Sequence, residues 1–379
     1  MSFSQFLEAK PLYYDTIDHQ RIHDAYRVLY PYIKEPKKVH IVGTNGKGSI
    51  GRIVAHLAHT SGLSVGHFSS PHILKFNERI WIDGEDSSDD MLELAHQKLY
   101  RVLGKERSDA LSYFEYTTLL ALVVFEDVDL VVLEAGLGGE FDATNICDKE
   151  LTIITPIGID HQAFLGATIE EIASTKIRSI QKQALLAPQI YQEVDKVAKE
   201  IALEKKAILH TLSISAQTEA KLKEIAKHNK WGEYLVQNAS TALYALDILA
   251  IDYTIETLKE LELFGRFYPF RENIRIDVGH NPLAAKAILQ ALERPIVLIY
   301  NSLDDKEYEE VLRVLKPKIK RVELIAISSQ RAVTLSSIEE ALKKVELEYT
   351  FFNNNIDPKE EYLVFGSFYV VEEFLRKIT

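Results

Sequence analysis

The sequence predicts an α/β protein in which helices pack around parallel sheets. Short apolar runs of strand length alternate with segments of helical periodicity through most of the chain. Each apolar run in the first half also ends in a polar, often glycine-rich, loop. Because 379 residues exceed what one hydrophobic core usually organises, we expect two domains. The larger should span residues 1–266, and a smaller α/β domain should span residues 267–379.

Three strands are expected in the first half of the chain. Each is a short apolar run, and they cover residues 39–42, 130–133 and 151–154. A helix should follow the first strand, because apolar side chains recur at helical spacing from Ile50 to Leu57. A second helix is predicted over residues 169–180, because residues 168–171 match a capping box and an apolar stripe follows.

The second half of the chain contains a new series of strands. Residues 182–236 are charged and rich in helical patterns, and they indicate no particular chemistry. The helical pattern stops at residues 263–269, which read LFGRFYP, so the second domain should begin near residue 267. Beyond this point strands are expected over residues 274–278, 296–300, 322–327 and 362–365.

Composition excludes several classes of protein. With 46% hydrophobic and 26% charged residues the chain should be globular. Its formal net charge of −12 disfavours a nucleic-acid partner. Cys147 is the single cysteine, and Glu8 and Lys10 interrupt any secretory signal, so we expect a cytoplasmic protein without disulfides. The longest apolar run, residues 119–125, is far short of a membrane span.

The loop GTNGKGS at residues 43–49 carries the clearest chemical signal. It lies between an expected strand and an expected helix, where backbone N–H groups and a helix N-terminus can bind phosphate. The match to the P-loop pattern is imperfect, because Ile41 replaces the first glycine and Gly48 is inserted before the serine. A glycine turn with a solvated lysine is the alternative. We expect nucleotide phosphates to contact Gly43, Thr44, Asn45, Gly46, Lys47, Gly48 and Ser49.

Including this loop, eight segments carry longer motifs. They read IVGTNGKGS at 41–49, SSPHILKFNERI at 69–80, FEYTTLLALVVF at 114–125, LEAGLGGEFDATN at 133–145, ITPIGIDHQAFLGATIEEIA at 154–173, DVGHNP at 277–282, LDDKE at 303–307 and GSFYVVEEF at 366–374. In this order they resemble the folylpolyglutamate synthase and dihydrofolate synthase family, a branch of the Mur ligases. The resemblance implies the Mur ligase architecture: a P-loop NTPase-like ATP-binding domain followed by a smaller Rossmann-like glutamate-ligase domain.

The resemblance also implies an ATP-dependent amide ligase. Such an enzyme joins the amine of L-glutamate to a folate carboxylate or to dihydropteroate, and we expect dihydrofolate synthesis together with polyglutamate extension of reduced folates. Because a free carboxylate is a poor acylating agent, transfer of the ATP γ-phosphoryl group would first form an acyl phosphate. The expected partners are these small molecules, without nucleic acid or membrane, and the protein is expected to act as a monomer.

Divalent cations should lie beside the loop, where they neutralise phosphate charge. The resemblance implies two magnesium sites, which manganese could also fill. Glu134 ends an apolar strand at the sheet edge where α/β proteins bind ligands, and by resemblance it binds one ion together with Ser70. By resemblance His161 binds the other, although nitrogen is an unusual magnesium ligand. The alternatives are a solvated glutamate and a locally hydrogen-bonded histidine.

Lys176 lies beside the apolar stripe of a predicted helix. Desolvation there disfavours the charged ammonium, and a neutral amine can capture carbon dioxide. In the family the matching lysine is carbamylated and its new carboxylate is a metal ligand, so the resemblance implies both for Lys176. A lysine that extends along apolar surface to reach solvent is the alternative.

Further candidates for the nucleotide and the other substrates follow from the resemblance. Asn238 matches a position that recognises adenine, Arg266 one that contacts phosphates, and Asp277 one at the ribose or metal. Asp142, in the motif FDATN, resembles the position that contacts the pterin. Positions around the incoming glutamate are matched by Arg79, His280 and Ser367. Arg79 suits this place because the planar fork of an arginine can bind a carboxylate.

Two other functions fit parts of the sequence. A Mur-type ligase of peptidoglycan precursors shares the ATP chemistry, but it ordinarily carries an extra N-terminal domain, and residues 1–38 are too few for one. A non-catalytic P-loop module would bind ATP without turnover. Catalysis is favoured because the chain combines Lys47 and Lys176 with the expected metal ligands Ser70, Glu134 and His161.

Overall fold

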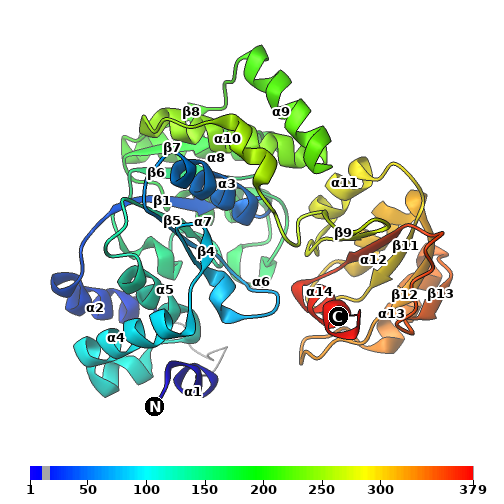
Figure 1. The fold of residues 1–379 in the computed structure, drawn as a ribbon, viewed down its shortest axis with the longest axis horizontal. Coiled ribbons are helices and arrows are strands. Elements are labelled where there is room, and N and C mark those ends of the chain that lie inside the picture. The colour runs from blue at the N-terminus through cyan, green and yellow to red at the C-terminus, as the bar shows by residue number, and fades with distance from the viewer. Residues whose placement is uncertain (11–17, 379) are drawn as a thin grey trace. The chain divides into compact units, whose positions relative to one another are not determined.

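The computed structural model describes residues 1–10 and 18–378, and the chain divides into two compact units (Figure 1). Each unit has its own sheet, in which parallel strands predominate, with helices packed against it. The α/β class predicted from the sequence is therefore confirmed. The first unit comprises Met1–Ile214 with Ser240–Thr257, and the second comprises Ser215–Ala239 with Leu258–Thr379.

Within the described residues, the first unit contains an eight-stranded sheet. Its strands are β1 (Lys37–Val42), β2 (Val65–Phe68), β3 (Ile80–Ile82), β4 (Glu85–Asp86), β5 (Leu130–Glu134), β6 (Leu151–Ile154), β7 (Gln183–Leu186) and β8 (Ile208–Thr211). Their spatial order is β4-β3-β2-β5-β1-β6-β7-β8. The strands from β2 to β8 in this order are parallel, whereas β3 and β4 add an antiparallel edge.

Helices cover this sheet and shield its apolar strands. The central strand β1 is buried after its first residue, and Val39 lies between Val132 of β5 and Leu151 of β6. One buried cluster joins α4 and α5 to β2 and β5, and another joins α7 and α8 to β6 and β7. The helices are α1 (Phe3–Glu8), α2 (His19–Leu29), α3 (Lys47–Thr60), α4 (Asp89–Ala110), α5 (Tyr113–Val124), α6 (Gln162–Leu165), α7 (Ile169–Ile177) and α8 (Gln192–Lys205).

The second unit is built on a six-stranded sheet, counted over the described part of the chain, in the order β13-β12-β11-β14-β10-β9. Only β9 (Tyr268–Arg271) is antiparallel. The other strands are β10 (Ile274–Ile276), β11 (Ile296–Tyr300), β12 (Ile319–Leu324), β13 (Tyr349–Phe351) and β14 (Tyr362–Phe365). Its helices are α9 (Ala216–Asn229), the first residues of α10 (Glu233–Leu249), α11 (Pro282–Ala291), α12 (Tyr308–Leu315), α13 (Leu335–Val345) and α14 (Phe368–Ile378).

Several predicted boundaries were wrong by a few residues. Helix α3 begins at Lys47 and not near Ile50, because Gly46 turns the chain directly into the helix. Strands β10 and β12 end at Ile276 and Leu324, earlier than predicted, and α7 ends at Ile177. The charged segment 182–236 also contains β7 and β8, which the helical patterns around them obscured. No helix in the described ranges is both long and apolar enough to cross a membrane.

Candidate active site

The loop of residues 43–49 leaves β1 at the sheet edge where β5 and β6 also end. In the register, Ile41 lies opposite Glu134, the last residue of β5. Val42 lies opposite Ile154, the last residue of β6. The segments that follow these three strands therefore start side by side, at the carboxyl edge where parallel sheets bind ligands.

Two glycines determine the path of this phosphate loop. Gly43 has a φ of 145°, and a Cβ atom added there would lie 1.9 Å from Thr155 Oγ1. Gly46 has a φ of 88° and is the N-cap of α3. Both positions favour glycine, because residues with side chains rarely adopt these conformations. The loop thus leads into a helix N-terminus, which attracts anions. The first turn of this helix is formed by Lys47, Gly48 and Ser49.

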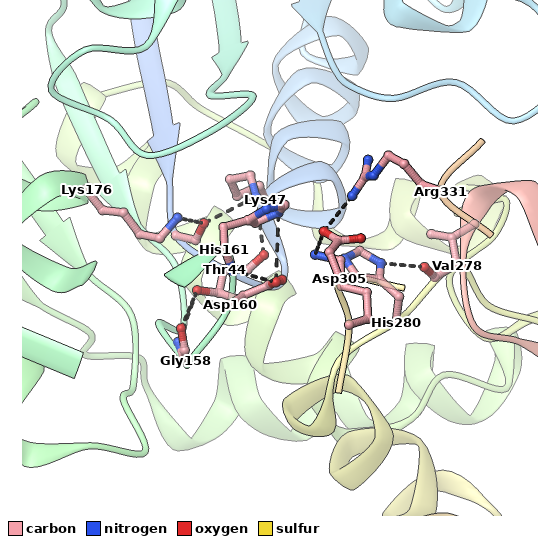
Figure 2. A network of polar contacts seen from close by, with 12 residues as sticks. Thr44, Lys47, Gly158, Asp160, His161, Lys176, Val278, His280, Asp305 and Arg331 are labelled. Carbon is pink, nitrogen blue, oxygen red and sulfur yellow. Dashed lines mark hydrogen bonds and ion pairs between the residues drawn. The ribbon is translucent and has the colours of Figure 1, made fainter. Parts of the chain in front are cut away.

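The Thr44 side chain ties the phosphate loop to the segment after β6. Its Oγ1 donates to Gly158 O and accepts from Gly158 N, both at 3.1 Å (Figure 2). The backbone N–H groups of Thr44 and Asn45 both donate to Pro156 O, at 3.0 and 3.2 Å. The threonine hydroxyl is thus used within the protein, and the two segments hold each other in position.

Two lysine ammonium groups converge on one carbonyl of the phosphate loop. Lys47 Nζ donates to Gly43 O and to Thr44 O, both at 3.3 Å. Lys176, on α7, is only 4% exposed, and its Nζ donates to Gly43 O at 3.0 Å (Figure 2). The Lys47 side chain and the N-terminus of α3 both attract anions at this loop. The geometry therefore favours a bound phosphate group.

Packing fixes the backbone around Lys176. A Cβ atom added at Gly139, in the loop after β5, would lie 2.3 Å from Lys176 O. Glu140 N donates to Thr175 O at 2.8 Å, so the same loop is bonded to α7. The close approach of loop and helix explains a glycine at position 139.

Glu134 and Ser70 lie next to each other at this edge of the sheet. Glu134 is 4% exposed, and its Oε2 accepts from Ser70 N at 3.4 Å. Ser70 lies two residues after the end of β2, which pairs with β5, so sheet pairing places the two residues side by side. A carboxylate and a hydroxyl are oxygen ligands of the kind that magnesium prefers.

His161 is the N-cap of α6, in the loop after β6. It adopts a φ of 52°, and its N–H donates to Asp160 Oδ1 at 2.9 Å. The His161 Nε2 atom lies 3.9 Å from the same carboxylate oxygen. Asp160 was not among the predicted residues, although an acidic residue directly before a candidate ligand is a signal that could have found it. It supplies a nearly buried negative charge at this edge of the sheet.

Asp142 stabilises its own loop. Its Oδ2 accepts from Leu137 N at 2.8 Å, and its Oδ1 accepts from Thr144 N at 2.9 Å and Thr144 Oγ1 at 2.6 Å. Thr144 Oγ1 also lies 2.8 Å from Nε2 of the buried His40 on β1. Burial raises the pKa of Asp142 despite these hydrogen bonds. The contacts make Asp142 a cap of this loop, and its role toward a pterin stays a prediction.

Arg79 is held in the loop between β2 and β3. Its Nε donates to His72 Nδ1 at 2.8 Å, and its guanidinium lies 5.3 Å from the ring of Tyr113. Burial, with the Arg79 charge, lowers the pKa of His72 to about 4, so the imidazole is neutral and Nδ1 can accept. The guanidinium is therefore positioned by aromatic and imidazole contacts.

In the second unit Asp277 directly follows β10 and holds three neighbouring segments together by hydrogen bonds. Its Oδ2 accepts from Phe267 N at 2.8 Å and from Tyr234 OH at 3.1 Å, and its Oδ1 accepts from Gly279 N at 2.7 Å. Burial raises the pKa of Asp277, which the charge of Arg266 opposes. The Arg266 guanidinium lies 5.4 Å from the ring of Phe368. Arg266 and Asp277 thus share one electrostatic environment, and Tyr234 is a partner that the sequence did not indicate.

The remaining predicted residues of this unit have separate surroundings. His280 Nδ1 lies 3.1 Å from Val278 O (Figure 2). Ser367 is 3% exposed, and its Oγ accepts from Val370 N at 3.2 Å as an N-terminal cap of α14. Asn238 is 5% exposed, and its buried Nδ2 donor has no hydrogen-bond partner among the described residues. Because an unmet buried donor is costly, Asn238 fits a position that bonds a ligand acceptor.

The loops after β11 and β12 carry an ion pair that sequence reasoning missed. Arg331 Nη2 donates to Asp305 Oδ2 at 2.6 Å, and Asp304 N donates to Arg331 O at 2.8 Å (Figure 2). Burial acts to raise the pKa of Asp305, but the Arg331 hydrogen bond and the charge of Lys306 hold it below its usual value. The motif LDDKE therefore joins two loops at the carboxyl edge of the second sheet.

Comparisons with known proteins identify relatives of this chain. A family model described as the Mur ligase middle domain matches residues 41–251. The dihydrofolate synthase/folylpolyglutamate synthase of Haemophilus influenzae is 31% identical, with 89% of this chain and 88% of the relative covered. The chain belongs to the dihydrofolate synthase/folylpolyglutamate synthase family. This membership confirms the resemblance and makes the protein an ATP-dependent ligase of the Mur ligase class.

Solved structures of the family have the same fold. The folylpolyglutamate synthetase of Helicobacter pylori is 37% identical with a TM-score of 0.80, covering 99% of this chain and 97% of that one. Escherichia coli FolC, solved in complex with DHPP and ADP, is 25% identical with a TM-score of 0.83, covering 100% and 98%. The Mur ligase architecture expected from the motifs is thereby confirmed.

The residues of the first unit fit a divalent cation that is shared with a nucleotide. In the part of the chain that the structure describes, no group of three or more histidine, cysteine and acidic side chains could hold a metal ion. Glu134 and Ser70 offer one carboxylate and one hydroxyl, and His161 offers an imidazole. Magnesium commonly takes one or two protein ligands and completes its coordination with phosphates and water. The donor set matches that pattern.

Replacing Thr44 with valine should loosen the phosphate loop, since the shape is kept while both hydrogen bonds to Gly158 are lost. We expect a loss of about 1–3 kcal/mol in the free energy of unfolding, because buried Gly158 groups lose their partner. Turnover should fall about tenfold, since small displacements in a reaction site are costly. Thermal unfolding and ligase assays check this, and the Thr44→Ser control should behave like the wild type. A valine variant with wild-type stability and turnover would contradict the prediction.

Proposed function

We propose that this protein adds L-glutamate to dihydropteroate, and also to reduced folates, through an acyl phosphate formed with ATP. The observation that carries the proposal is the place of Lys47 at the start of α3, in the loop beside the sheet edge where Glu134 meets Ser70. Cations around a phosphate loop stabilise the charge that develops in phosphoryl transfer. The name of the Haemophilus influenzae relative and the ADP bound by Escherichia coli FolC support the same assignment.

The proposed reaction has two steps. A carboxylate oxygen of the acceptor attacks the γ-phosphorus, the bond to the bridging oxygen breaks, and ADP leaves. The glutamate amine then attacks the acyl carbon, loses a proton and releases inorganic phosphate. Lys47 would neutralise negative charge on the transferred group, while the first turn of α3 holds the phosphates by its backbone N–H groups. Both effects act mainly by position and charge.

Magnesium, which manganese could replace, would supply further neutralisation of phosphate charge when bound. We propose Ser70, Glu134 and His161 as its protein ligands, with Lys176 as a fourth when carbamylated, in two sites. The buried Nδ2 of Asn238 suits an acceptor on adenine, and Arg266 and Asp277 suit the phosphates and ribose. For glutamate and the pterin we propose Arg79, His280, Ser367 and the loop that Asp142 caps.

We propose separate roles for the two parts of the chain. We assign ATP binding to residues 1–266 and glutamate ligation to residues 267–379, in a monomer that works in the cytoplasm. Light scattering on the purified protein, with and without substrates, tests the monomer. A stable dimer under all conditions would overturn that part alone.

A direct assay tests the function. The purified protein is incubated with ATP, magnesium and glutamate, together with dihydropteroate or a reduced folate, and both phosphate release and product mass are followed. We expect phosphate release only when pterin and glutamate are both present, with a product heavier by one glutamyl residue. Extension of a reduced folate alone would remove the dihydropteroate half of the proposal.

The same assay separates the two other functions considered. A ligase of peptidoglycan precursors would release phosphate with a nucleotide-linked precursor and an amino acid, and not with a pterin. A non-catalytic module would bind ATP without releasing phosphate under any of these conditions. Either result would overturn the proposal.

A further inference from the structure

The loop between β2 and β3 is shaped by a carboxylate from within the loop itself. Glu78 Oε2 accepts from Ile73 N at 2.7 Å, and Glu78 Oε1 accepts from Leu74 N at 2.7 Å and Lys75 N at 2.8 Å. Three successive backbone N–H groups thus face one carboxylate, in the manner of a backbone anion-binding concavity. Hydrogen bonds to a charged acceptor are roughly twice as strong as neutral ones, so Glu78 is a strong organiser of this loop.

Both ends of the loop are fixed as well. At its base Ser69 N donates to Arg79 O at 2.9 Å, next to the register pair Phe68 and Ile80 of the two strands. The Asn77 side-chain amide donates to Ser87 O at 2.7 Å and to Asp89 Oδ1 at 2.9 Å. The sheet therefore anchors the root of the loop, and the Glu78 carboxylate fixes its tip.

This loop carries two residues of the proposed site. Ser70 follows the root directly and its N–H contacts Glu134 on the neighbouring strand β5. Arg79 ends the loop and donates to His72, the residue before the segment that Glu78 holds. A change in the backbone path of residues 73–75 would therefore displace both Ser70, beside Glu134, and the Arg79 guanidinium.

We propose that Glu78 is a positioning residue for the ligase reaction, which holds Ser70 beside Glu134 and Arg79 in its bonded position. The inference rests on the proposed function, because Ser70 and Arg79 take their roles from it. Glu78 itself touches neither substrate nor metal in this account. It acts through the backbone of residues 73–75, because its carboxylate accepts hydrogen bonds from their N–H groups.

The test compares Glu78→Gln with the wild type. Glutamine keeps the volume but brings an NH₂ group against backbone donors, so the loop should shift. We expect kcat to fall about tenfold and the magnesium concentration for half-maximal rate to rise severalfold. A displacement of catalytic groups or metal ligands by about an ångström is enough to have such effects. Amide hydrogen exchange in the peptide covering residues 69–80 should also become faster, in the absence of substrate or metal.

Two further variants make the test decisive. Glu78→Ala leaves the three N–H groups open to a small anion, so formate should restore part of the activity to this variant and none to Glu78→Gln. Glu93→Gln is the matched control, because Glu93 Oε2 also accepts a backbone N–H, from Phe3 at 2.7 Å, but on α4. It should keep the wild-type magnesium dependence.

The outcomes distinguish this inference from the proposed function. Wild-type protein without ligase activity would overturn the proposed function, while altered hydrogen exchange in the glutamine variant would still support the loop contact. An active wild type with unchanged magnesium dependence and unchanged exchange in Glu78→Gln would overturn the inference alone. A variant that only unfolds at lower temperature, with kcat per folded molecule and magnesium dependence intact, would also overturn it.

Discussion

Replacing Lys47 with methionine should lower kcat by about two to three orders of magnitude and leave the fold intact. Removal of one preorganised donor to developing charge typically has this effect. The fold should persist because the loop is held by other contacts: Thr44 is bonded to Gly158, and Gly43 is packed against Thr155. Lys47 itself bonds only carbonyls of its own loop among the contacts above, and these can be solvated in its absence.

The measurement for Lys47 is phosphate release with dihydropteroate, glutamate and ATP, alongside thermal unfolding. Lys105→Met is the control, because it removes the same charge from an exposed position on α4, where Lys105 is paired with Asp109. Turnover close to the wild type in the Lys47 variant would show that the loop does not bind the transferred phosphate. Such a result would remove the central support of the proposed chemistry.

Replacing Lys176 with alanine should lower turnover by about a hundredfold, and short carboxylic acids should restore part of it. Lys176 is nearly enclosed, and a carbamate there would present oxygen atoms to a metal that an ammonium group cannot bind. In the alanine variant a small acid such as acetate can occupy the vacated space and supply those oxygens. The size of the effect follows from the loss of a metal ligand or of its supporting contacts.

The matched control for Lys176 is Lys149→Ala. Lys149 is another buried lysine of the same unit, 2% exposed, with Asn145 as a partner. It precedes β6, at the opposite end of that strand from the phosphate loop. Its loss should reduce stability, but acetate should not change its turnover. Carbon-13 NMR after incubation with labelled bicarbonate gives an independent readout, with a carbamate signal in the wild type that Lys176→Ala lacks. Full activity of Lys176→Ala would refute the role.

Much of the fold could be predicted because burial leaves a direct mark on sequence. The strands at 39–42, 130–133 and 151–154 are buried on both faces, so they are continuous apolar runs that stand out from their surroundings. Two of the strands that were missed have weaker signals. Strand β4 has two exposed acidic residues, and β8 is partly exposed and lies among charged helices.

The candidate site was only partly predictable, for a related reason. A loop such as GTNGKGS can be found from the sequence, because a phosphate site needs glycines and a lysine at fixed spacing. Contacts between residues that are far apart in the chain cannot be found in this way. Nothing in the spacing indicates that Tyr234 bonds Asp277 or that Arg331 pairs with Asp305, since those contacts arise only when distant strands align their ends.

The chain of hydrogen bonds from His40 through Thr144 to Asp142 has a consequence for substrate choice. It links the loop after β5, which we propose for the pterin, to the buried central strand β1, so this loop should keep its shape when an acid of unfamiliar shape binds. Discrimination among acceptors should then come from a preformed contour rather than from induced fit. Substitutions meant to broaden the range of acids should therefore change exposed side chains such as Leu137 and Phe141. They should leave the buried hydrogen bonds of His40, Thr144 and Asp142 in place.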